Sequence, residues 1–155
     1  MNEQELIQFV QEIVSKSNDL KNKHTSEKKA PVNYACIFCQ SEEQFNEFVE
    51  ITKNIGEIAQ ETLTGPLFQI HIDTVAGKLQ LLKIRKPDEK RKELGDADFT
   101  VSNYFEFKEK YLNKEEFNLI VRKGFEMIEL IDPEFDVLVY FSNPPLDKQL
   151  GIVTG

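Results

Sequence analysis

The stretch GDADFTV, residues 95–101, restarts a secondary-structure pattern that the chain has already used once. Ala97–Val101 combines apolar and β-branched residues and predicts a strand. Ser102 and Asn103 follow, and either side chain can cap the start of a helix by accepting a backbone hydrogen bond. A charged link, residues 88–95, separates this point from the preceding strand. The sequence therefore predicts that a second strand–helix unit begins here.

The same order of elements is predicted on both sides of this point. In the first half, a strand at Val32–Cys39 leads to a helix that begins after Ser41, and three strands follow. In the second half, three strands again follow the helix. These later strands are predicted at Ile58–Leu63, Leu67–Asp73, Leu79–Arg85, Phe117–Arg122, Phe125–Ile131 and Val137–Ser142.

Two explanations account for this order: a duplicated βαβββ unit, or two unrelated segments that share an order of elements. Ser41 and Ser102 hold similar places before the two helices, and prolines end both units, which favours duplication. The predicted fold class is α+β within one globular domain. Its parts are an N-terminal helix and linker at 1–30, a first module at 31–87, and a second module with a C-terminal tail at 88–155.

The N-terminal segment has a helical pattern. Residues 3–20 carry apolar side chains at three- and four-residue steps, which predicts a helix with one apolar face. That face must pack against the rest of the chain or against a partner. Residues 21–30 are polar and basic, so an exposed linker that contains His24 is predicted.

Composition limits the classes of partner. The 155 residues include 19 Lys and Arg against 27 Asp and Glu, for a net charge of −8. A surface of this sign repels nucleic acid and anionic lipid, so neither is predicted as a partner. The N-terminus has no apolar signal segment, no run is long enough to cross a membrane, and two cysteines suggest free thiols. A cytoplasmic location is expected.

Three short strings carry a resemblance to a known family: PVNYACIF at 31–38, LLKIRKPDEKR at 81–91 and GDADFTV at 95–101. Together with the repeated βαβββ order, they resemble the vicinal oxygen chelate superfamily, which includes glyoxalase I, extradiol dioxygenases and bleomycin-resistance proteins. The chain looks most like the YecM-like branch, which also has an N-terminal helical extension. The resemblance implies that the two modules form curled mixed sheets around a shared cup.

In that superfamily, the first strands of the modules supply metal-binding His residues and the last strands supply Glu. Matching by position puts Asp98 and either Tyr34 or Asn33 on the first strands. It puts Lys83 and Tyr140 on the last strands. Only Asp98 is a good ligand for a divalent cation, and Lys83 would repel one. The resemblance therefore implies a cup without the family's usual metal-ligand set.

Two other features could supply chemistry. Lys83 and Arg85 are two residues apart on a strand and share one face, which would favour an anionic ligand if that face lines the cup. An edge strand with a solvated basic face fits the same alternation. His71 could act with Asp98 as a base or as displaced metal ligands, although a lone strand histidine is usually structural or solvent-facing.

The leading hypothesis is a protein that binds a small, anionic molecule through Tyr34, Lys83, Arg85, Asp98 and Tyr140. The two tyrosines would donate hydrogen bonds to the ligand or stack on it. No catalytic residue is predicted, and whether the protein is an enzyme stays open. The alternatives are a lyase, isomerase or dioxygenase that uses a divalent metal with displaced ligands, and a protein–protein module that uses the helix or the sheet edges. A homodimer would cover such edges.

Two further patterns indicate packing or solvation. Cys36 and Cys39 are three residues apart on a strand, so they face opposite sides and cannot form a thioredoxin-type pair or a zinc site. Acidic residues between Glu126 and Asp136 surround the last hairpin. They put carboxylates on both faces of a strand, which predicts a solvated hairpin and not a catalytic carboxylate pair.

Overall fold

A computed structural model of the chain describes residues 1–152. Four helices and eight strands lie within these residues, in the predicted order as far as β8; the short helix α4 in the C-terminal tail was not predicted. The helices are α1 (Glu3–His24), α2 (Glu42–Thr52), α3 (Tyr104–Tyr111) and α4 (Leu146–Leu150). The strands are β1 (Val32–Phe38), β2 (Glu57–Thr62), β3 (Gly65–Thr74), β4 (Gly77–Arg85), β5 (Gly95–Phe99), β6 (Phe117–Arg122), β7 (Phe125–Leu130) and β8 (Val137–Asn143). The last three residues of the predicted C-terminal tail lie outside the described residues.

All eight strands belong to one sheet, in the order β2-β3-β4-β1-β5-β8-β7-β6. Within each module the first strand pairs with the last in parallel, β1 with β4 and β5 with β8. The modules meet where β1 pairs with β5 antiparallel, so the two four-stranded halves form a continuous sheet. The predicted α+β fold with two βαβββ modules and curled mixed strands is confirmed.

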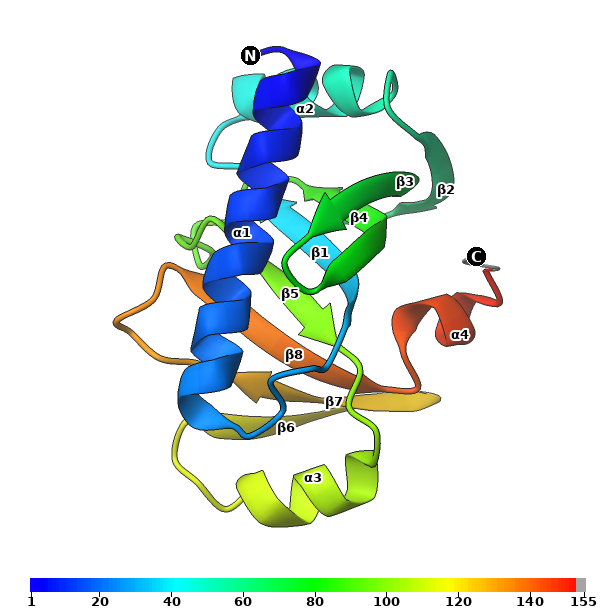
Figure 1. Cartoon of the computed structure of the whole chain (residues 1–155). Helices are drawn as coiled ribbons and strands as arrows, with labels where there is room; N and C mark the ends of the chain where they lie inside the picture. Colours follow the sequence, from blue (N-terminus) through cyan, green and yellow to red (C-terminus); the bar gives the residue numbers. More distant parts are fainter. Residues whose placement is uncertain (153–155) are drawn as a thin grey trace.

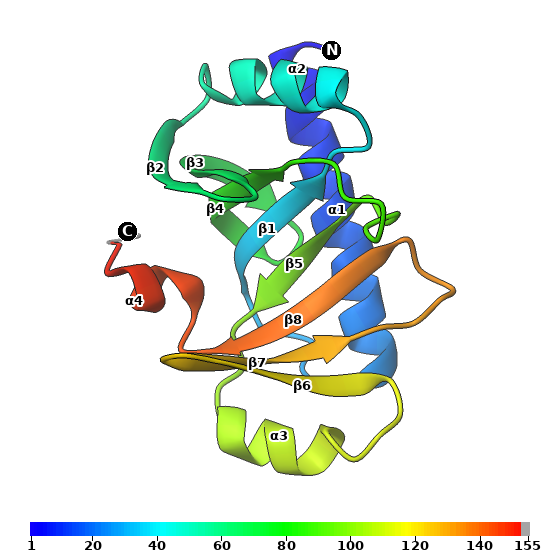
Figure 2. The same cartoon turned by 180° about the vertical axis from the view of Figure 1, so that it is seen from behind.

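The helices are distributed differently over the two faces of the sheet. In Figure 1, α1 crosses one face along most of the molecule, with α2 and α3 at its two ends. Figure 2 shows the molecule from the other side. The strands there lie in front of α1, and α4 lies beside the sheet. None of the helices in residues 1–152 is long and apolar enough to cross a membrane.

Helix α1 starts at a capping box and is longer than predicted. The Asn2 side chain accepts a hydrogen bond from the Glu5 backbone at 2.8 Å, and the Glu5 carboxylate accepts one from the Asn2 backbone at 3.0 Å. The helix continues to His24, so the expected exposed linker from residue 21 is wrong at its start. Lys21 is fully buried, and its Nζ donates to the Glu27 carbonyl at 2.6 Å.

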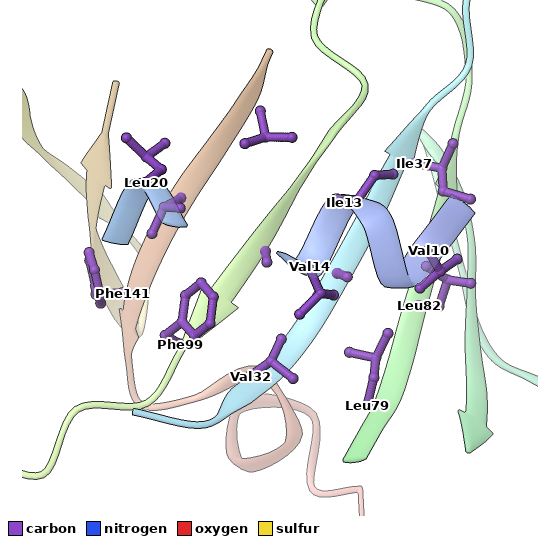
Figure 3. Close-up of a cluster of buried hydrophobic side chains, with 14 of the residues drawn as sticks. Val10, Ile13, Val14, Leu20, Val32, Ile37, Leu79, Leu82, Phe99 and Phe141 are labelled. Atoms are coloured by element: carbon purple, nitrogen blue, oxygen red, sulfur yellow. The ribbon is translucent and has the colours of Figure 1, made fainter. Parts of the chain in front are cut away.

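The apolar stripe of α1 packs on the sheet and forms the main core. Figure 3 shows Val10, Ile13 and Val14 of α1 pointing at side chains from the strands beneath them. Strand β1 alternates: Ala35 and Ile37 join this core. Because the stripe is buried within the chain, α1 does not present the free apolar face that a partner helix site would need.

The loop between β7 and β8 is attached to the C-terminal half of α1. Asp132 accepts hydrogen bonds from Lys23 Nζ and His24 Nε2, both at 2.8 Å, and Asp136 pairs with Lys16 at 3.0 Å. Asp132 is buried, so the prediction of a solvated hairpin is wrong there, as is the exposed position expected for His24. The cause is the extra turn of α1, which brings basic side chains to this loop.

Candidate functional site

A cavity of about 290 Å³ lies on the face of the sheet opposite α1. On β1, Tyr34, Cys36 and Phe38 point to this side. Both modules and α4 contribute to its walls. The lining residues are Tyr34, Phe38, Gln60, Thr62, Leu67, Lys83, Arg85, Arg91, Asp96, Asp98, Ile120, Arg122, Phe125, Met127, Tyr140, Ser142, Leu146, Gln149 and Leu150.

All five residues predicted to bind a ligand meet at this cavity: Tyr34, Lys83, Arg85, Asp98 and Tyr140. Lys83 and Arg85 lie on the same side of β4, as their spacing predicts. The topology brings the five together because β1 and β5 pair at the centre of the sheet and β4 and β8 flank them. Whether these residues bind a ligand stays a prediction.

Other candidates from the sequence lie elsewhere. His71 is exposed on β3 and does not line the cavity, so the structure does not bring it to Asp98. Asn33, the alternative to Tyr34, donates from Nδ2 to Asp98 Oδ1 at 3.0 Å and supports that carboxylate. Cys36 and Cys39 are buried free thiols on opposite sides of the sheet, as predicted.

Four cationic side chains line the cavity: Lys83, Arg85, Arg91 and Arg122. Burial lowers the pKa of Lys83, with the nearby Arg85 acting in the same direction. Within residues 1–152, the Nε atom of Arg85 is buried without a hydrogen-bond partner, and its Nη2 donates to the Asp88 carboxylate at 3.4 Å. A buried guanidinium N–H without an acceptor is costly, so Arg85 retains an unused donor at the wall of the cavity.

Asp98 is held by hydrogen bonds within the protein. Ser142 donates to it from both its hydroxyl and its backbone N–H, the latter at 3.2 Å, and Asn33 donates at 3.0 Å. Burial raises the pKa of Asp98 to about 6 against the opposing effect of these donors. Because both oxygens of Asp98 already accept hydrogen bonds, its first role is to fix β5 against β8.

Asp96 also lines the cavity, and the sequence analysis missed it. Asp96 is 8% exposed, and its Oδ1 has no hydrogen-bond partner among residues 1–152. Burial, with the nearby Asp98, raises the pKa of Asp96 to about 8, although Arg91, Arg85 and Lys83 oppose the shift. The carboxyl is therefore largely protonated and neutral at pH 7. The sequence could have identified Asp96 as a lining residue, because it is two residues before Asp98 and shares the same face of the strand.

Both tyrosines at the cavity are neutral, and the hydroxyl hydrogen of Tyr140 is already used within the protein. Tyr140 donates its hydroxyl hydrogen to Glu129 at 2.7 Å, so towards a ligand it can act only as an acceptor or as a ring surface. Burial raises the pKa of Tyr34 well above the ordinary range, and the neighbouring Cys36 adds to the shift. Both side chains are neutral phenols at physiological pH.

Arg91 reaches the cavity from the link between β4 and β5. Its guanidinium lies over the ring of Phe38, 5.8 Å from the ring centre. Gln40 holds this link in place: its Nε2 donates to the backbone oxygens of Arg91 at 3.1 Å and Glu93 at 3.2 Å. Nothing in the local sequence distinguishes Arg91 from the solvated charges beside it.

The lining residues do not fit a divalent cation. Within residues 1–152, no three side chains of His, Cys, Asp or Glu are grouped as a metal site. Of the positions that match the family's ligands, Tyr34, Lys83 and Tyr140 are poor ligands or cationic, and Asp98 accepts from Ser142 and Asn33. The cations beside them would also repel a metal ion.

Comparisons with known proteins identify a shared fold. No protein-family model matches the sequence, and no curated protein matches it significantly. Among solved structures, the structural-genomics protein EC4020 gives a TM-score of 0.71 at 9% sequence identity, over 96% of this chain and 91% of that chain. Similarity at this level of identity shows that the fold is shared and does not transfer an activity.

Two further structures are similar at lower scores. A glyoxalase/bleomycin resistance protein/dioxygenase superfamily member from Vibrio splendidus gives a TM-score of 0.47 at 10% identity, over 73% of this chain and 97% of that chain. Methylmalonyl-CoA epimerase from Mycobacterium tuberculosis gives 0.43 at 13% identity, over 76% and 91%. TM-scores below 0.5 are too low to support conclusions about this chain.

Proposed function

We propose that the protein binds a small anionic molecule in the cavity between its two modules, as a glyoxalase-fold protein without the usual metal-ligand set. The observation that carries this proposal is the buried, unpartnered Nε of Arg85 in a cavity that Lys83, Arg91 and Arg122 also line. An oxyanion would accept the free N–H and could bind the guanidinium through two hydrogen bonds.

The charge of the cavity is opposite to that of the protein. The chain carries a net charge of −8, yet four cationic residues and only two carboxyl groups line the cavity. Asp96 is largely neutral at pH 7, because its pKa is about 8, so Asp98, which neutral donors stabilise, leaves one negative charge against four cationic residues. A positive cavity in an acidic protein attracts anions to one place on the molecule.

The walls also limit the ligand's size and character. The volume of about 290 Å³ is at the lower end of the range for small-molecule sites. Phe38, Leu67, Ile120 and Met127 supply apolar surface beside the cations. A compact organic anion with an apolar body fits this combination better than a large nucleotide or an inorganic ion.

The repeated βαβββ topology supports membership of the vicinal oxygen chelate superfamily, together with the sequence strings that resemble it. Assignment to its YecM-like branch rests on those strings and on the N-terminal helix. A cytoplasmic location and a homodimer stay predictions. The homodimer is suggested by β2 and β6, which leave two open sheet edges.

A ligand screen with matched variants tests the proposal. Thermal unfolding is followed for the wild-type protein, Arg85→Ala and Lys78→Ala in a panel of compact organic carboxylates, sulfonates and phosphate esters. Lys78 is the matched control because it is an exposed cation on β4 and does not line the cavity. Ligand binding raises the melting temperature by mass action.

At least one anion is expected to raise the melting temperature of the wild-type protein and of Lys78→Ala, with the effect reduced or lost in Arg85→Ala. If no anion in the panel has an effect, or if every effect persists in Arg85→Ala, the cavity is not the anion site proposed. Neutral amides of the same acids serve as the ligand control.

A further inference from the structure

Within residues 1–152, two buried polar atoms of cavity-lining residues have no hydrogen-bond partner: one is a donor and the other a carboxyl oxygen. The Nε–H of Arg85 is a donor without an acceptor. Oδ1 of Asp96 is a carboxyl oxygen without a donor, on a residue that is 92% buried. Buried polar atoms are rarely left unpaired in folded proteins, and each exception requires an explanation such as a functional role or a bound water or ion. Both atoms belong to side chains that line the same cavity.

The two side chains are close enough to act on one small ligand. Arg85 on β4, together with Lys83 and Arg91, lowers the pKa of Asp96 against the effect of burial, which places these cations within electrostatic range of the carboxyl. β1 lies between β4 and β5, and its residue Cys36 pairs with Lys83 on one side and Asp96 on the other. Arg85 pairs with Phe38, so the two orphan groups lie on the strands that flank β1 and are offset by two residues along them.

We propose that the ligand is a hydroxy acid, with its anionic group bound at Arg85 and its hydroxyl bound at Asp96. This inference rests on the proposed function and specifies the class of its ligand. A hydroxyl both donates and accepts, so it can satisfy the free oxygen of Asp96 whichever oxygen carries the proton. The four cationic residues that line the cavity would repel the ammonium of an amino acid, so they favour a hydroxyl beside Asp96.

Two of the polar groups near Asp96 are already engaged within the protein. Asp98 on the same strand is occupied by Ser142 and Asn33. The Tyr140 hydroxyl on β8 donates to Glu129. Tyr34 and Cys36 on β1 are neutral, buried groups whose pKa values are raised well above their usual ranges.

The test compares acids that differ only by replacement of a hydroxyl with a methyl group. The pairs are lactate with isobutyrate, 3-hydroxybutyrate with 3-methylbutyrate, and 3-(hydroxymethyl)benzoate with 3-ethylbenzoate; alanine serves as the amino counterpart of lactate. Dissociation constants are measured by titration calorimetry for the wild-type protein, Asp96→Ala, Asp96→Leu and Arg85→Ala. The two Asp96 variants guard against a folding defect in either one.

In at least one pair, the hydroxy acid is expected to bind the wild-type protein about tenfold or more tightly than its methyl analogue, since losing the hydroxyl leaves Asp96 unpaired. The Asp96 variants should lose this preference while they still bind the methyl analogue. Arg85→Ala should weaken both members equally. Anion binding without any hydroxyl preference, tighter binding of alanine than of lactate, or a preference that survives in Asp96→Ala would overturn the inference. Absence of all anion binding would instead refute the proposed function.

Discussion

The two faces of the sheet bury their side chains in different ways. Under α1, most fully buried side chains are apolar, such as the Ile13, Ile37 and Phe141 labelled in Figure 3, and the buried Lys21 is paired with the Glu27 carbonyl. On the opposite face, burial includes the carboxyls of Asp96 and Asp98 among cations and aromatic rings. Burying apolar surface stabilises the fold, whereas burying polar groups costs stability unless they are paired. The first face holds the protein together, and the second carries the features expected of a site.

Carboxyl groups show the same contrast. Hydrogen bonds from Lys23, then from His24, hold the pKa of Asp132 far below its usual range beside α1. In the cavity, burial raises the pKa of Asp96 to about 8. Folding therefore favours the ionised form of Asp132 and the protonated form of Asp96. Asp132 therefore helps to attach the loop between β7 and β8 to α1, whereas Asp96 has a carboxyl oxygen without a hydrogen-bond partner among residues 1–152.

The largest effect on stability is expected from Phe141→Ala, on the face of the sheet that α1 covers. Phe141 is fully buried, and its ring centre lies 4.5 Å from that of Phe107 and 6.5 Å from that of Phe99. The cavity left behind should lower the free energy of unfolding by about 3–5 kcal/mol, measured by urea denaturation. Phe105→Ala is the control, because that ring is 69% exposed and should change stability by less than ~0.5 kcal/mol. Equal losses in the two variants would contradict the division of the faces.

Asp96→Asn is expected to change the free energy of unfolding by less than Phe141→Ala does, and to raise it relative to the wild-type protein as pH rises. Between the carboxyl's ordinary pKa of 3.8 and its folded value of about 8, the folded protein keeps a proton that the unfolded chain releases. The stability of the wild-type protein therefore falls as pH rises through this window, by about 1.4 kcal/mol per pH unit from this group. The Asn variant lacks that slope.

The free energy of unfolding of Asp96→Asn should accordingly gain about 2–3 kcal/mol relative to the wild-type protein between about pH 5 and pH 7. Urea denaturation at the two pH values measures the gain. Asp73→Asn, an exposed change on β3, is the control and should show no comparable gain. A constant difference between Asp96→Asn and the wild-type protein would mean that Asp96 is ionised in the folded state.

The smallest effect on stability is expected from Arg85→Ala. Its Nε makes no hydrogen bond in the folded protein, so its removal should change the free energy of unfolding by less than ~1 kcal/mol. The same variant is expected to lose anion binding. A large loss of stability by urea denaturation would show that Arg85 is part of the structural framework and not of a binding site.

The strands could be predicted closely from the sequence, and the exceptions have physical causes. β6 and the end of β4 match their predicted bounds, because alternating apolar residues and flanking glycines or prolines mark them. β5 begins at Gly95, two residues before its predicted start, because pairing with β1 and β8 draws a polar segment into the centre of the sheet. That shift hid Asp96 from the sequence analysis.

The remaining parts of the site depend on the tertiary structure. Arg91 belongs to a run of charges that looks solvated, and only the hydrogen bonds of Gln40 to the link reveal its place at the cavity. The predicted helix ended at Leu20 because residues 21–30 are polar and basic, yet Lys21 continues the helix and its buried ammonium donates to the Glu27 carbonyl. In both cases a contact distant from the local pattern fixes the side chain.

The most direct measurement of anion binding at the cavity is the Nε–H resonance of Arg85 in a proton–nitrogen correlation spectrum. Arg85→Lys assigns the resonance, and the anion that raises the melting temperature of the wild-type protein most in the ligand panel is titrated to about 20 mM. The account predicts a saturable shift at Arg85, with amides of β4 and β5 following the same curve and those of α1 unchanged. A saturable shift confined to residues outside the cavity, or no shift at Arg85, would contradict it.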